Sequence, residues 1–216
     1  MSKFAKISKL DNTDGFLQID YFKGNKYIDK AGEFLNTLYE SKTETPSFTM
    51  NPLGAEIALE KGKKRIEVSN NKLWTAYTNP DSLEVQKQFF TKVFDNATKL
   101  FEPFSYSRLG WRNYFVTEQS LEKTVFFDKS RWYDGDFREL YIEKEFGKIK
   151  SNVRISKVKN TITQAEGLMF DIDLYRHFND EKDTSVIKQS LNEIATCFSS
   201  DELLKLINDT LQDVGK

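Results

Sequence analysis

The stretch SYSRLGWRNYFVTEQ, residues 105–119, decides the fold class, because charged and apolar side chains alternate along it. Such alternation is typical of an extended strand with one face toward a core. The polar face carries Arg108, Gly110, Arg112 and Tyr114, and the apolar face carries Leu109, Trp111, Asn113 and Phe115. The stretch therefore predicts a strand of a half-buried sheet, and it leaves open what the two arginines bind.

Length and composition limit the class of protein. A chain of 216 residues is long enough to bury about 70% of the surface that its unfolded form exposes. The 18 Phe, 9 Tyr and 3 Trp supply much of the core. Since 32 basic residues nearly balance 33 acidic ones, the chain lacks the strong positive charge of proteins that coat duplex DNA.

Helical periodicity marks four further segments. Residues 27–39 and 83–101 carry apolar side chains at three- and four-residue steps, and Asn79-Pro80-Asp81 and Pro103 bound the second of these. A charged helix is expected over residues 186–198. The capping-box pattern at Ser199-Ser200-Asp201-Glu202 then opens a last helix.

Strand patterns occupy most of the remaining chain. They cover residues 14–22, the hairpin AEIALE-KGKK-RIEVSN, KLWTAYT, RELYIEKEF, SNVRISKVK and EGLMFDIDLY. Residues 46–52 are expected to break the pattern, residues 120–136 to be helical or irregular, and the Asn160 region to form a turn. The predicted fold is α+β: a mainly antiparallel sheet, amphipathic helices packed on one face, and a C-terminal helical segment. We expect a single compact domain, 1–216, in which 1–103 and 104–216 are two closely packed halves.

Several common classes of enzyme lack their signature. Phosphate-binding glycine loops and nucleophile elbows do not occur in the sequence. The one histidine, His177, is expected in a loop or cap at a strand end, and the one cysteine, Cys197, excludes an internal disulfide. An enzymatic role is therefore disfavoured, and no cofactor or metal site is predicted.

Asp171 and Asp173 alternate with apolar residues, so both carboxylates project from the polar face of their strand. If this strand neighbours the arginine strand, the two acids pair with Arg108 and Arg112. A magnesium site that also uses Glu56 and Glu60 is the less favoured reading of these acids. Alternatively the arginine face binds an outside anion near Gly110, with Tyr114 or Trp74 stacking on a base or another ring.

The same residues carry a family resemblance. SRLGWRNYF, preceded by a long amphipathic helix and followed by DIDLY and a helical tail, resembles a sporadically distributed, uncharacterised bacterial family. That family has an R-[IL]-G-x-R strand and a C-terminal D-x-D strand. Arg108, Gly110 and Arg112 match the first motif, and Asp171 and Asp173 match the second, over roughly Glu56 to the C-terminus. The resemblance implies a mobile or defence-associated bacterial gene and supplies no activity.

Charge distribution adds the last expectation. The segment 144–159 carries six basic residues, whereas 180–213 carries eight carboxylates against three lysines. Such faces pair internally or attract a partner protein. We expect a non-catalytic cytoplasmic protein that binds a partner protein or itself, as an accessory component of a bacterial defence or toxin-control system. The alternative is a nucleic-acid or phosphate-binding protein using Arg108 and Arg112, or a Mg²⁺-dependent phosphodiesterase or nuclease. No membrane association is expected.

Overall fold

The computed structural model describes residue 7 and residues 11–24, 26–39, 46–117, 139–159 and 166–213. A nine-stranded antiparallel sheet forms its centre, with the order β2-β3-β4-β5-β1-β6-β9-β8-β7. The strands are β1 Asp11–Phe22, β2 Ser47–Asn51, β3 Gly54–Leu59, β4 Lys64–Val68, β5 Lys72–Thr78, β6 Ser105–Thr117, β7 Glu139–Phe146, β8 Ile149–Lys159 and β9 Glu166–Glu181. The helices are α1 Tyr27–Leu38, α2 Leu83–Phe101, α3 Thr184–Phe198 and α4 Asp201–Asp213, with a 3-10 turn at Glu60–Gly62. The predicted α+β class is confirmed.

The order of the strands is similar on the two sides of the central β1–β6 pair. Outward from the β1–β6 pair, the strands follow as β5, β4, β3, β2 on one side and as β9, β8, β7 on the other. Both β5 and β9 lead within a few residues into a long helix, α2 and α3 respectively. Because β1 pairs with β6 along its length, residues 1–103 and 104–216 contribute to one continuous sheet.

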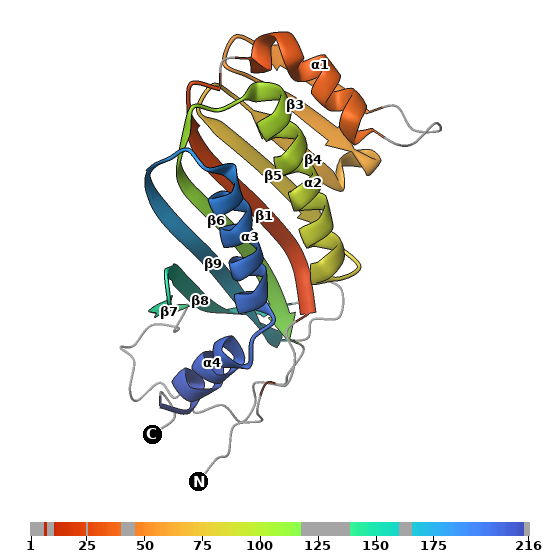
Figure 1. Ribbon diagram of the computed structural model, residues 1–216. Helices are drawn as coiled ribbons and strands as arrows, with labels where there is room; N and C mark the ends of the chain where they lie inside the picture. The colour runs from red at the N-terminus through yellow and green to blue at the C-terminus, as the bar shows by residue number, and fades with distance from the viewer. Residues whose placement is uncertain are drawn as a thin grey trace.

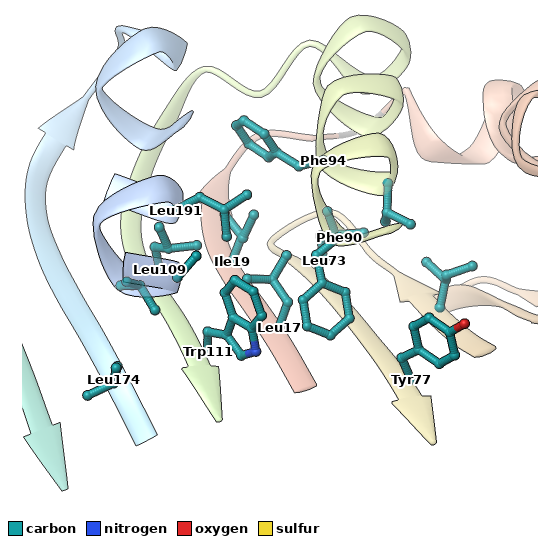
Figure 2. Close-up of a cluster of buried hydrophobic side chains, with 14 of the residues drawn as sticks. Leu17, Ile19, Leu73, Tyr77, Phe90, Phe94, Leu109, Trp111, Leu174 and Leu191 are labelled. Atoms are coloured by element: carbon teal, nitrogen blue, oxygen red, sulfur yellow. The ribbon is translucent and has the colours of Figure 1, made fainter. Parts of the chain in front are cut away.

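The helices α2 and α3 lie side by side across the same face of the sheet, and α1 lies over its β3 end (Figure 1). Trp111 of β6 is fully buried beneath them. Its ring meets Phe90 of α2 edge-on at 5.2 Å and Phe198 of α3 at 5.5 Å. Figure 2 shows Leu17, Leu109 and Trp111 of the central strands pointing into this layer. The predicted apolar face of the arginine strand therefore forms the core.

Local signals explain where α2 begins and ends. The side chain of Ser82 accepts a hydrogen bond from the Val85 N–H at 3.2 Å, so the N-cap is Ser82 and not the preceding Asn79-Pro80-Asp81. At the other end, Glu102 adopts a left-handed conformation (φ 45°) directly before Pro103. Proline cannot continue the helical hydrogen bonding, so Pro103 ends the helix as the sequence predicts.

Two expectations about local structure were wrong. Residues 46–52 do not simply break the pattern, because 47–51 form β2, which pairs with β3. His177 does not lie at a strand end, because β9 continues to Glu181 and places His177 opposite Arg108. In each case a neighbouring strand supplies backbone hydrogen bonds that local sequence does not encode. The expectations for residues 120–136 and for the Asn160 turn lie outside the described residues.

Candidate binding surface

The second face of the sheet is the candidate site. The helices α1, α2 and α3 cover the first face, and the side chains at the centre of the second are half-buried or exposed, apart from the buried Ala76 and Asp171. Cross-strand register brings residues from β5, β1, β6 and β9 into adjacent rows there. We call this surface the open face, and its central residues are Phe16, Trp74, Arg108, Arg112, Tyr114, Asp171, Asp173 and Tyr175.

Arg112 and Asp171 form the strongest interaction of the open face. The Arg112 Nε donates to Asp171 Oδ1 at 2.6 Å, and its Nη2 donates to Oδ2, so the contact is bidentate. The Asp171 side chain is only 7% exposed, whereas that of Arg112 is 43% exposed. The hydrogen bond to Asp171 raises the pKa of Arg112 above its usual range. A buried carboxylate is thus paired with a half-exposed guanidinium.

Arg108 reaches its carboxylate by lying over Gly110. Its Nη2 is 3.3 Å from Asp173 Oδ2, although the residue directly opposite Arg108 is His177. A Cβ on Gly110 would lie 2.7 Å from that same Nη2. The space that the sequence suggested for an outside anion is therefore occupied by the protein's own guanidinium group. Burial raises the pKa of Asp173, and the charges of Arg108 and Arg112 oppose this shift.

Aromatic rings surround these ion pairs. Phe16 contacts Trp74 at 5.7 Å and Tyr114 edge-on at 5.6 Å between ring centroids. Arg112 lies over the ring of Tyr114 at 5.2 Å, and Arg108 lies over the ring of Tyr175 at 5.4 Å. Guanidinium groups held between carboxylates and ring faces have little freedom left to lose. The centre of the open face is therefore preorganised.

The structure brings most of the sequence-predicted residues onto one surface: Trp74, Arg108, Arg112, Tyr114, Asp171 and Asp173. The ion pairs of Arg108 and Arg112 with Asp171 and Asp173 are present, and they answer what these arginines bind within the chain. Trp74 joins the cluster from two strands away, through contact with Phe16. Glu56 and Glu60 do not join Asp171 and Asp173. Across the described ranges no three His, Cys, Asp or Glu residues are grouped so as to hold a metal ion.

A hollow of about 590 Å³ adjoins the open face on its β2–β5 side. Its charged lining consists of Asp20, Glu56, Glu67 and Lys72. Glu56 and Glu67 face each other directly across β3 and β4, an arrangement that repels, and Lys72 lies 3.6 Å from Glu67. Asp20 pairs in register with both Lys72 and Arg108, which connects the hollow to the arginine cluster.

Sequence reasoning missed part of this surface and a polar cluster beneath α2. Phe16 and Tyr175 belong to the open face, and the alternation of their strands could have identified them. The cluster joins Gln86 of α2 to Asn12, at 3.2 Å, and Asn113 accepts from the Trp111 indole at 3.0 Å. The Gln86 and Asn113 side chains are fully buried, and no local pattern could have indicated that they are neighbours.

Comparison with known proteins gives no family assignment. No protein-family model matches the chain, and no curated protein matches it significantly. Among the described residues, no helix is both long and apolar enough to cross a membrane.

Proposed function

We propose that the chain is a non-catalytic binding protein whose open face docks onto a partner protein. One observation carries the proposal: Trp74, Tyr114, Tyr175, Arg108 and Arg112 cluster on the face that the described helices leave uncovered. Trp, Tyr and Arg are the residue types that contribute most binding energy at protein interfaces. A half-buried group of them at the centre of a rigid sheet has the composition of an interface hot spot.

Preorganisation supports the same proposal. Immobilising a long side chain on binding costs about 0.5–1.5 kcal/mol. Arg108 and Arg112 are already held by Asp173 and Asp171 and by two tyrosine rings, so most of this cost is absent. The carboxylates also keep the surface near neutrality, which suits contact with an uncharged or mixed protein surface.

The setting of this function is part of the proposal. The similarity of SRLGWRNYF and DIDLY to a sporadic bacterial family supports an accessory role in a bacterial defence or toxin-control system. We place that role in the cytoplasm, in keeping with the single cysteine, Cys197.

Nucleic-acid or phosphate binding through the same arginines has less support. Both guanidinium groups already bind carboxylates, so a phosphate would have to displace Asp171 and Asp173. An outside anion would also meet the negative charge of those two acids. This alternative predicts binding that weakens as salt concentration rises, and the experiment below includes that measurement.

The experiment compares two single substitutions in the full chain. Trp74→Ala removes a ring from the open face. Gln189→Ala removes an exposed side chain of α3, on the opposite side of the sheet. Cross-linking in an extract of the source cells, followed by mass spectrometry, identifies a protein captured by the wild type. With that protein purified, calorimetry should show Trp74→Ala weakening binding at least tenfold, about 1.4 kcal/mol, and Gln189→Ala having no effect.

Two results would contradict the proposal. The first is equal loss, or equal retention, of binding in the two variants. The second is salt-sensitive binding of oligonucleotides by the wild type that Arg112→Met abolishes, with no protein captured; this would favour the nucleic-acid alternative.

A further inference from the structure

The two ends of the sheet differ in how they are protected. At one end β7 carries Glu143, Lys144 and Glu145, and exposed edge strands commonly use such charges against pairing with another chain. At the other end β2, with the sequence SFTMN, has no charged residue, and all of its residues are exposed. Within the described part of the chain, β2 has β3 as its single neighbour. In this part of the chain β2 is therefore an edge strand without the charged side chains that oppose pairing with another strand.

The hairpin register determines which backbone groups of β2 are free. A two-residue turn, Pro52-Leu53, joins β2 to β3. In such a hairpin the residues on either side of the turn, here Asn51 and Gly54, form a hydrogen-bonded pair. Hydrogen-bonded and non-hydrogen-bonded pairs alternate from there along an antiparallel ladder. Thr49 therefore bonds to β3, whereas the N–H and C=O groups of Phe48 and Met50 point away from it, toward the open edge.

Apolar side chains accompany these free backbone groups. Phe48 is 39% exposed, Met50 is 41% exposed, and Leu53 in the adjoining turn is 85% exposed. Phe48 pairs with the fully buried Ile57, so its side chain leaves the sheet on the face that α1 covers. Clustered exposed apolar side chains mark interaction sites more often than isolated ones do.

We infer that β2 pairs antiparallel with β2 of a second copy of this chain, about a two-fold axis at Thr49. In this register Phe48 of each copy faces Met50 of the other, and the outward N–H and C=O groups of both residues are all satisfied. Thr49 of one molecule lies opposite Thr49 of the other, and a Thr–Thr pair across two strands is favourable. The result is one sheet continuous across two molecules, built from identical surfaces on both copies.

Charge favours a second copy as the occupant. An antiparallel β2–β2 pair brings no charged side chain against another, because the strand contains none. The same operation on β7 about Glu143 would bring that carboxylate against its own copy, which is unfavourable. Pro46 and Pro52 flank β2 and limit the pairing to this short strand. This inference concerns the sheet edge and does not depend on the function proposed for the open face.

Sedimentation of the purified full chain over a range of concentrations tests the pairing. The wild type should show a monomer–dimer equilibrium. The double variant Phe48→Lys/Met50→Lys should dissociate at least tenfold more readily, because each lysine would face a lysine of the other copy. Tyr141→Lys, which adds a lysine at an exposed position of the opposite edge strand, is the control and should leave the equilibrium unchanged.

A charge-reversed partner excludes misfolding as the cause. The variant Phe48→Glu/Met50→Glu should also be monomeric, and mixing it with the lysine variant should restore a dimer, since lysine then faces glutamate. A monomeric wild type at every concentration would overturn the inference. So would a dimer that the double variants do not weaken, or a mixture that stays monomeric. Trp74→Ala should leave the dimer intact, which separates this result from failure of the open-face proposal.

Discussion

Replacing Arg112 with methionine isolates the contribution of its charge. Methionine keeps the apolar stem beside Tyr114, but it leaves the Asp171 carboxylate, 7% exposed, without its bidentate partner. Breaking a fully buried ion pair costs about 3–5 kcal/mol. Because Arg112 is 43% exposed and solvent already screens the pair, we expect a loss of about 2–3 kcal/mol in the free energy of unfolding. For a chain of this length that lowers the melting temperature by roughly 5–10 °C.

Denaturant titration and calorimetry of four proteins measure this effect: the wild type, Arg112→Met, Asp171→Leu and the double variant. The double variant should lie close to the wild type, since a buried pair can be exchanged for apolar residues at little cost. Arg65→Ala, at an exposed position of β4, is the control and should change stability by less than about 0.5 kcal/mol. A loss from Arg112→Met that is no larger than the control's would refute the reasoning.

Three further outcomes are expected. Gly15→Ala should lower the melting temperature by roughly 5–10 °C, from an overpacking cost of about 2–3 kcal/mol, because its Cβ would lie 1.8 Å from Nε2 of the buried Gln86. Gly32→Ala, whose Cβ meets nothing within 4 Å, should not destabilise, and a similar melting point for both variants would contradict the overpacking. Carbon-13 NMR should show the pKa of Asp173 raised above its ordinary 3.8. The contribution of Asp173 to stability then falls as pH rises through the folded-state pKa. An unshifted pKa would contradict the burial of this carboxylate. Ser82→Ala should cost α2 about 1 kcal/mol in a denaturant titration, and no change would mean that the cap does not stabilise the helix.

The sequence by itself determined which face of each element is buried. Alternation in residues 105–117 assigned Trp111 to the core and Arg112 to the opposite face, and the apolar spacing of α2 assigned Phe90 to the same core. These assignments need only the chain's local geometry, since side chains alternate along a strand and recur every three to four residues along a helix. For the same reason the α+β class and the extent of α2 could be predicted without a structure.

Only the tertiary structure decided which strands are neighbours and in which register. The β6–β9 pairing places Asp171 and Asp173 beside Arg112 and Arg108, although the pairs are separated by 59 and 65 positions in the chain. It also extends β9 through His177, and pairing with β3 turns residues 47–51 into an edge strand. Backbone hydrogen bonds between strands are the same for every residue type except proline, so local sequence does not specify a partner. The choice follows from burying all the apolar faces at once, which is a property of the whole chain.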